Sequence, residues 1–448
     1  MEDSRRQRLI ELGAEELADV LGNLALQNED VARTVARLTS SGQENAKRFT
    51  RALGDLKRRN KFYGSRESFE LARQLTGILA DLTAARLEPR SGVQAMVDFY
   101  RADTRIFESC DDSFGNVSDV FCHDAVDVFA SYASECTDED WIVEVVIELN
   151  QRDDYCVRLS LLERSADYLS ESGLQDLIMR LWNLVGDDPD APGAYQWLGA
   201  IERIARQMKD AALFEKARRA LKSDLSIIDC EEIAKLYHES GDSETALYWL
   251  QFHPEAPSLI AGSRRWLLVD IHRKLGNLEA MAEAAREIFQ SHRSEDAFEV
   301  LIEALGENQR AQVIDDETRK ILQTETFSIS DAGFLANVGR TDEAGKYVLA
   351  RAAQIDGNYY SSLKPLAERM DKSGRPLASS MIYRALLNSI LERGQSKYYH
   401  HGIGYLKKLD RLAKAVSNWR DFAPHRGYVA GLRGEHGRKR SFWSRYAG

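Results

Sequence analysis

The chain has few of the residues that interrupt helices or cross-link a fold. Only 8 prolines occur among 448 residues, and none precedes Pro89, so little opposes helix formation in the N-terminal part. The cysteines are odd in number and widely spaced, which argues against a disulfide framework and favours reduced thiols. We therefore expect a cytoplasmic protein. The five cysteines are Cys110, Cys122, Cys136, Cys156 and Cys230.

Long hydrophobic runs are also missing. No window approaches the run of about eighteen apolar residues that a membrane span needs. The first residues, Met-Glu-Asp-Ser-Arg-Arg-Gln-Arg, are charged and lead into no long apolar stretch, unlike a secretory signal. We expect no membrane span and no secretory signal.

Short catalytic motifs are absent as well. The sequence contains no glycine-rich phosphate loop, no nucleophile elbow and no His-Glu-x-x-His of zinc proteases. Helical repeats can still frame an active site from dispersed residues, so an unrecognised enzyme stays an alternative. Our expectation is a non-catalytic protein without a cofactor.

Charge is distributed unevenly along the chain. Hydrophobic residues make up 44% and charged residues 29%, which is ordinary for a folded soluble protein. The net charge is −11, yet residues 393–448 hold 13 Lys and Arg against three Asp and Glu, a net of +10. The preceding 392 residues therefore carry −21 by subtraction. This asymmetry between an acidic body and a basic end is the most informative electrostatic feature of the sequence.

Glycines recur in the second half with a period of about 34 residues, as in tetratricopeptide-like arrays. Each is followed four or five positions later by alanine. Glycine supplies the left-handed conformation that ends a helix at a tight turn, and alanine lets two helices approach closely. Gly173 extends the series backward, with a weak step near Met208. The pairs are Gly241 and Ala246, Gly276 and Ala280, Gly306 and Ala311, Gly339 and Ala344, and Gly374 and Ala378.

These patterns predict an all-α fold, an α-solenoid of helical hairpins preceded by an N-terminal helical subdomain. The first 88 residues indicate four amphipathic helices, with Ser65 as the N-cap of the fourth. A run of β-branched residues, 141–149, is also assigned to a buried helix. The predicted segments are an N-terminal subdomain (1–88), a helical linker with early repeats (89–172), the repeats (173–392) and a basic C-terminal helical segment (393–448).

Three segments together resemble an uncharacterised bacterial family of helical proteins, whose members are similar to the long C-terminal region of some SWIM zinc-finger proteins. The first runs from Leu56 to Ala72 and contains Lys-Arg-Arg-Asn-Lys-Phe-Tyr-Gly. The second is Phe107-Glu-Ser-Cys-Asp-Asp-Ser-Phe-Gly-Asn-Val117, and the third extends from Tyr399 to Trp443. The resemblance implies a helical fold. The zinc module itself needs Cys-x-Cys and Cys-x-His pairs, which this chain lacks, so zinc binding is not carried over.

The basic C-terminal segment is the first candidate site. Its cations are interleaved with aromatic rings, and such a pattern can follow a phosphate backbone and stack on unpaired bases. The alternative is that the cations pair with the acidic body or are merely solvated. The candidate nucleic-acid-binding residues are Lys407, Arg411, Lys414, Arg420, Arg426, Arg433, Arg438, Lys439, Arg440 and Trp443.

Two further groups suggest metal ligands but are better explained structurally. Asp111, Asp112 and Ser113 have the residue types of a calcium loop, yet the glycine is misplaced and the final glutamate is missing; Cys110, Cys122 and His123 fit no known finger spacing. We interpret the acidic residues as turn and helix caps. The neighbours His400 and His401 are expected to point about 100° apart on a helix. No metal site is predicted.

The leading functional hypothesis is a non-catalytic helical-repeat scaffold that binds a protein partner. The alternatives are a nucleic-acid-associated protein that uses the basic C-terminal segment, and an unrecognised enzyme.

Overall fold

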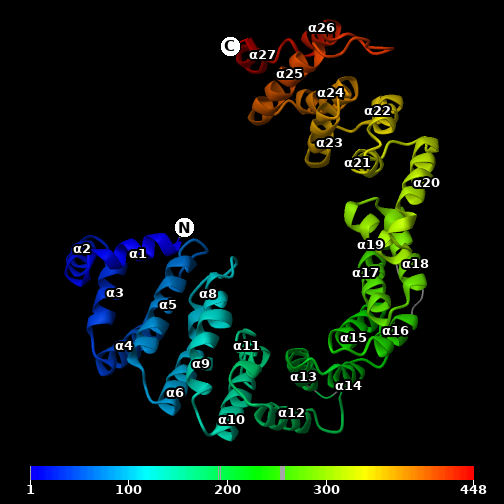
Figure 1. Ribbon diagram of the computed structural model, residues 1–448. Coiled ribbons are helices and arrows are strands. Elements are labelled where there is room, and N and C mark those ends of the chain that lie inside the picture. The colour runs from blue at the N-terminus through cyan, green and yellow to red at the C-terminus, as the bar shows by residue number, and fades with distance from the viewer. Residues whose placement is uncertain (1, 190, 192, 253–257, 448) are drawn as a thin grey trace. The chain divides into compact units, whose positions relative to one another are not determined.

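The computed structural model describes residues 2–189, 191, 193–252 and 258–447, and these residues are almost entirely helical (Figure 1). Within them no β-strand occurs, and an isolated bridge pairs Tyr63 with Cys110. The prediction of an all-α fold is therefore confirmed. Contacts between helices divide the chain into two units, 1–252 and 253–448. The finer boundaries at 88, 172 and 392 stay predictions.

In the first unit the helices pack against near neighbours along the chain. Its helices are α1 (Glu2–Leu12), α2 (Ala14–Gln27), α3 (Glu29–Thr39), α4 (Gly42–Arg58), α5 (Ser68–Ala85), α6 (Pro89–Tyr100), α7 (Asp103–Glu108), α8 (Asn116–Asp119), the π-helical η1 (Val120–Asp124), α9 (Ala125–Ala133), α10 (Glu139–Asn150), α11 (Leu159–Glu163), the 3-10 helix η2 (Ser165–Asp167), α12 (Glu171–Val185), α13 (Ala194–Met208), α14 (Ala211–Leu221), α15 (Ile227–Glu239) and α16 (Ser243–Gln251).

The second unit is built in the same way and ends in the predicted basic segment. Its helices are α17 (Ser258–Leu275), α18 (Leu278–Ser291), α19 (Glu295–Leu305), the 3-10 helix η3 (Glu307–Gln309), α20 (Arg310–Gln323), α21 (Ile329–Asn337), α22 (Thr341–Ala350), the 3-10 helix η4 (Ala352–Gln354), α23 (Tyr360–Lys372), α24 (Pro376–Arg393), the 3-10 helix η5 (Ser396–Tyr398), α25 (Tyr399–Ala413), α26 (His425–His436) and α27 (Arg440–Ala447).

The periodic glycines occupy the turns between paired helices, as predicted. All five have positive φ, from 70° at Gly276 to 100° at Gly241, a conformation that costs glycine little and other residues more. They separate α15 from α16, α17 from α18, α19 from α20, α21 from α22, and α23 from α24. The spacing therefore reports a repeat of helical hairpins.

The backward extension to Gly173 is wrong. Gly173 lies inside α12, where an added Cβ would come within 2.6 Å of the Glu139 carboxylate. This glycine therefore lies beside another helix and not in a turn. The weak step near Met208 does match a turn, because Lys209 between α13 and α14 adopts a φ of 56°.

The early alanines serve as close-packing positions in only part of the array. Ala246, Ala344 and Ala378 are buried, as the prediction requires. The prediction is wrong for Ala280, which is partly exposed, and for Ala311, which is exposed. In α18 the buried alanines come later in the helix, and η3 separates α19 from α20.

The N-terminal part holds five helices and not the four predicted, because α1 precedes the first expected helix. Ser65 does not cap α5, which begins at Ser68 after a turn. The expected helix over 141–149 is confirmed as α10, whose N-cap is Asp138. Its β-branched residues are largely buried, which explains how burial overrides their weak helix propensity.

Each unit has its own hydrophobic core. The core of the first unit also contains an ion pair in which Arg158 donates to both carboxylate oxygens of Asp103, each at 2.7 Å. Both side chains are almost fully buried. Such a pair fixes which helices meet, since either charge alone would be costly to bury.

Candidate functional site

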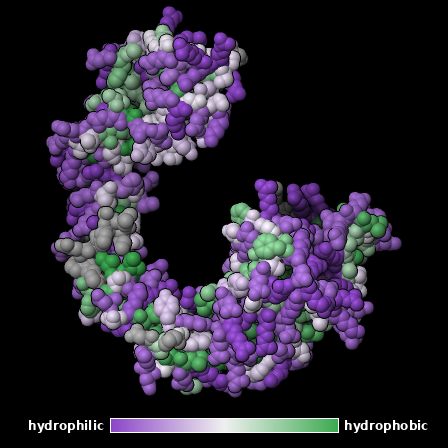
Figure 2. Space-filling model, turned by 180° about the vertical axis from the view of Figure 1, so that it is seen from behind, coloured by the Kyte–Doolittle hydropathy of each residue, from purple (hydrophilic) through white to green (hydrophobic). Residues whose placement is uncertain are grey.

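The helices α1 and α2 expose an apolar surface. On α2, Val20, Leu21 and Leu24 follow one another at helical spacing, yet no residue of this helix is buried. Figure 2 shows hydrophobic patches over this end of the chain, including its right-hand edge. The apolar surface comprises Leu9, Ile10, Leu12, Val20, Leu21 and Leu24, whose exposed fractions range from 40% to 53%. Leu26, which is 87% exposed, lies on the opposite side of α2.

Polar contacts with the next part of the first unit come from α3, which packs against both α2 and α5. Arg37 of α3 donates to Asp81 of α5 at 2.8 Å and to the Gly77 carbonyl oxygen at 3.3 Å. Asp30 of α3 likewise pairs with Arg73 of α5. The stripe on α2 is therefore spaced for burial but has little to bury it within the described residues. Exposed acidic residues border it, namely Glu11, Glu15, Glu16 and Asp19.

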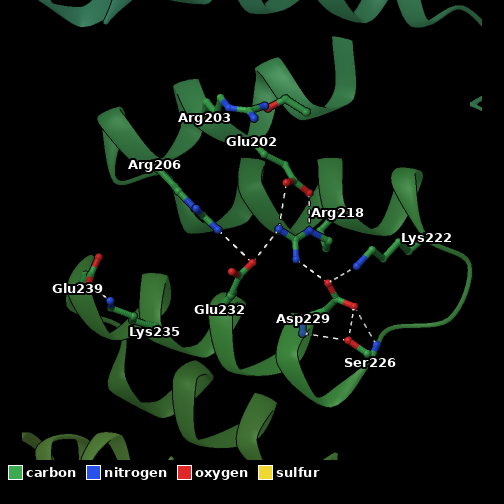
Figure 3. Close-up of polar contacts among 11 residues, drawn as sticks. Glu202, Arg203, Arg206, Arg218, Lys222, Ser226, Asp229, Glu232, Lys235 and Glu239 are labelled. Atoms are coloured by element: carbon green, nitrogen blue, oxygen red, sulfur yellow. Dashed lines mark hydrogen bonds and ion pairs between the residues drawn. The ribbon is translucent and has the colours of Figure 1, made fainter. Parts of the chain in front are cut away.

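A polar cluster joins α13, α14 and α15 around Arg218 (Figure 3). Arg218 donates to both carboxylate oxygens of Glu202, at 2.5 and 3.0 Å. It also donates to Asp229 at 2.5 Å and to Glu232 at 2.8 Å. Its guanidinium is almost buried, as are the first two carboxylates. One guanidinium thus ties three carboxylates from two other helices.

Further cations balance this cluster. Lys222 lies 2.7 Å from Asp229, and Arg206 lies 3.0 Å from Glu232. Burial alone would raise the pKa of Asp229, but hydrogen bonds from Lys222, Ser226 and Arg218 outweigh it and hold that pKa below its ordinary value. A carboxylate held ionised in this way is a poor proton acceptor.

A cavity of about 550 Å³ lies beside the cluster and includes Glu202, Arg206, Arg218 and Glu232 in its lining. These charged groups already satisfy one another. We therefore interpret the cluster as a structural joint between α13, α14 and α15.

The ten predicted residues of the basic C-terminal segment differ in whether their side chains contact other side chains of the protein. Arg411 pairs with Asp371 of α23, Arg433 lies over the Trp443 ring at 4.5 Å, and Lys439 is half-buried. The other cations are exposed and pair with no carboxylate among the described residues: Lys407, Lys414, Arg420, Arg426, Arg438 and Arg440.

The aromatic rings of this segment serve packing. Trp443 is 8% exposed, and its indole N–H donates to the His436 carbonyl oxygen at 2.9 Å. Phe442 is fully buried, and the Tyr446 hydroxyl donates to Asp410 at 2.9 Å. These rings are therefore not presented as a stacking platform, although the nucleic-acid hypothesis for the cations stays a prediction.

The acidic turn at 111–113 caps a helix. Asp112 accepts hydrogen bonds from the backbone N–H groups of Val117 and Ser118, at 2.8 and 2.9 Å, which confirms the capping interpretation. Two segments behind the family resemblance meet here, because Tyr63 and Cys110 form the bridge and Asn116 donates to Ser68 at 3.2 Å. Groups of three ligand-type side chains able to hold a metal are absent among the described residues.

The expectation that His400 and His401 diverge is wrong. Their ring centroids lie 3.9 Å apart, because side-chain torsions can bring neighbouring rings together despite the helical twist. Burial and the neighbouring His400 lower the pKa of His401.

Sequence patterns located some of these features and missed others. The stripe on α2 was identified as amphipathic, but its exposure could not be read from spacing. Arg218 and Glu202 carried no signal, because their partners come from three helices and follow no local motif.

The arrangement of helices defines an α-helical repeat protein. Within the described part of the chain, no helix is long and apolar enough to cross a membrane. The chain belongs to the Family of unknown function (DUF6880), whose model matches residues 5–315 and, in a second overlapping match, 199–445.

Among curated proteins no relative matches the sequence. A solved structure described as a circular tandem repeat protein with novel repeat topology and enhanced subunit contact surfaces matches with 15% identity, over 96% of this chain and 98% of that chain. Its TM-score is 0.16, so the likeness carries no argument.

Proposed function

We propose that this protein is a non-catalytic helical-repeat scaffold that binds a protein partner through the apolar surface of α1 and α2. The observation that carries the proposal is a helix, α2, whose apolar stripe is spaced for burial and yet contributes no buried residue. Fully burying an exposed leucine contributes about 1.5–3 kcal/mol. Val20, Leu21 and Leu24 are 40–46% exposed, so covering each of them contributes roughly half of that. We also propose a cytosolic location, because Cys110, Cys122, Cys136 and Cys156 are unpaired thiols.

The occupant that fits best is an amphipathic helix of the partner with a basic border. Helical repeats bury their faces against further helices, and helix-in-groove recognition uses the same spacing of anchors. The acidic residues Glu11, Glu15, Glu16 and Asp19 around the stripe favour Lys and Arg on the partner.

A synthetic amphipathic peptide with leucines at helical spacing and lysines elsewhere tests this proposal. We expect the full chain to bind the fluorescently labelled peptide and the variant L21E/L24E to bind it at least about tenfold more weakly. The control is Leu184→Glu on α12, a leucine that is 39% exposed outside the surface. Equal loss in the control and the double variant would contradict the proposal. Dimerisation that the double variant abolishes would replace the partner by a second copy of the chain.

A second candidate is nucleic-acid binding by the exposed C-terminal cations, which the resemblance to the helical region of SWIM zinc-finger proteins also favours. Seven of the ten candidate residues are exposed cations without an acidic partner among the described residues, and one of these, Arg433, lies over the Trp443 ring. We expect them to contribute through phosphate contacts alone.

Fluorescence anisotropy with labelled single- and double-stranded DNA and RNA over a salt series tests this candidate. Binding should weaken steeply with salt and be lost when Lys407, Lys414, Arg438 and Arg440 are changed to Gln. Arg411→Gln is the matched control, because Asp371 already neutralises that cation. No binding at low salt would rule out this candidate.

A further inference from the structure

Arg384, in the middle of α24, is a buried guanidinium without a carboxylate. The residue is 7% exposed, and among the described residues it forms no ion pair. Its Nη2 donates to the Ala423 carbonyl oxygen at 2.9 Å, while its buried Nε has no acceptor. By contrast, the buried Arg158 and Arg218 are each paired with acidic side chains. A buried cation that lacks a partner is costly unless something else supplies the charge.

Two aromatic rings hold this guanidinium in place. Its central carbon lies 4.8 Å from the Trp419 ring centroid and 4.3 Å from the Tyr428 ring centroid. The Tyr428 hydroxyl donates to Asn388 at 2.7 Å, which fixes that ring against α24. The rings attract the cation and exclude water from it, but they do not neutralise it. Arg384 is therefore oriented in advance and left with hydrogen-bonding capacity.

The guanidinium lines a cavity of about 430 Å³ in the second unit, a size typical of sites for small ligands. Arg384, Asn388 and Glu392 recur every four residues on α24, so they share one face of the helix. At a rise of 1.5 Å per residue, the first and last of them are about 12 Å apart along the axis. Asp356, in the loop before α23, adds a second carboxylate to the lining.

The lining thus has a cation at one end of the helical face and a carboxylate at the other. With one arginine and two carboxylates among the lining residues, the net charge is −1, which opposes phosphates and other polyanions. Among the described residues the Nη1 of Arg384 has no hydrogen-bond partner, and a guanidinium N–H matches a carboxylate well. A ligand that also carries a cationic group would meet Glu392 or Asp356.

We propose that this cavity binds a zwitterion, a small molecule that places a carboxylate on Arg384 and an ammonium group toward Glu392 and Asp356. This inference goes beyond the proposed scaffold function and does not depend on the α1–α2 surface. A free amino acid and a short peptide with two free termini share this chemistry.

Calorimetric titration of the full chain with a homologous series of ω-amino carboxylates, from glycine upward, tests the proposal. Alkyl carboxylates and alkyl amines of matched length carry only one of the two charges. Inorganic phosphate is an anion without an ammonium group. We expect one chain length to bind best, and at least about tenfold more tightly than either single-charge analogue. Short glycine peptides form a parallel arm. Tighter binding of one of these peptides than of every amino carboxylate assigns the site to short peptides.

Two variants separate the ends of the ligand. Arg384→Gln should lose both the zwitterions and the alkyl carboxylates. The exposed Glu392→Gln should weaken the zwitterions but leave alkyl carboxylates unchanged, and it keeps the test decisive if Arg384→Gln does not fold. Phosphate binding tighter than every zwitterion, zwitterion affinity unchanged by Glu392→Gln, or no binding at millimolar ligand would each overturn the proposal.

Discussion

Arg218→Met would decide whether the cluster of Figure 3 is a structural joint. The change keeps most of the aliphatic volume but removes the guanidinium that ties Glu202, Asp229 and Glu232. Asp229 retains Lys222 and Ser226, and Glu232 retains Arg206. Glu202 alone would lose its cation, while its side chain is only 12% exposed.

The expected loss follows from these remaining contacts. Removing one partner of a buried ion pair lowers the free energy of unfolding by about 3–5 kcal/mol. Because only the Glu202 carboxylate would lose its partner, we expect a loss near the lower limit, about 3 kcal/mol. For a unit of this size, each kcal/mol lowers the melting temperature by roughly 2–4 °C. We therefore expect a decrease of roughly 6–12 °C in the transition of the first unit.

Differential scanning calorimetry of the full chain measures this shift. The matched control is Arg219→Met on the same helix. Its pair with Glu215 is more exposed, with side chains 53% and 22% exposed, and contributes at most about 1 kcal/mol. The double variant E202Q/R218M should recover part of the loss, since no buried charge is then left alone. A loss in R218M no larger than in the control would refute the structural assignment, and we would reconsider the cavity beside the cluster as a ligand site.

Three further predictions follow from named contacts. The folded pKa of Asp229 lies below its ordinary value of about 3.9. The stability that Asp229 contributes is therefore present above that ordinary value and is lost as the pH falls through the folded pKa. We expect the difference in melting temperature between wild type and Asp229→Asn to shrink below about pH 4, and a constant difference would contradict this. Gly241→Ala, at a φ of 100°, should destabilise the chain by about 1 kcal/mol or more in urea unfolding, whereas Gly333→Ala, inside α21 with open space around it, should stabilise it by up to about 1 kcal/mol. Burial raises the pKa of Cys110 and Cys122 to about 11. After brief iodoacetamide treatment at neutral pH, we therefore expect mass spectrometry to find the exposed Cys156 alkylated first. Earlier labelling of Cys110 would show that its surroundings open in solution.

The sequence alone was sufficient for the helical class and for the hairpin repeat. Helix formation depends on local features such as scarce proline, apolar spacing and caps. The glycines from Gly241 to Gly374 could be placed in turns because a positive φ selects glycine from its own backbone geometry. The same rule failed at Gly173, which lies inside α12 beside Glu139 of α10.

The tertiary structure decided which of these local features are available for function. Spacing identified Val20, Leu21 and Leu24 as an apolar stripe, but a stripe that is buried and one that is exposed have the same period. Charge counting identified the basic C-terminal segment, but only packing placed Trp443 in the core and Arg411 beside Asp371.

Arg384 shows the physical reason most clearly. A buried arginine is normally matched by a carboxylate, and whether one is present depends on residues from other helices and loops. Nothing in the local sequence of α24 distinguishes this arginine from a solvated one. Trp419 and Tyr428, more than thirty positions further along, surround it only after the chain has folded. Local periodicity therefore determined the fold of this protein, whereas contacts between distant residues determined its candidate sites.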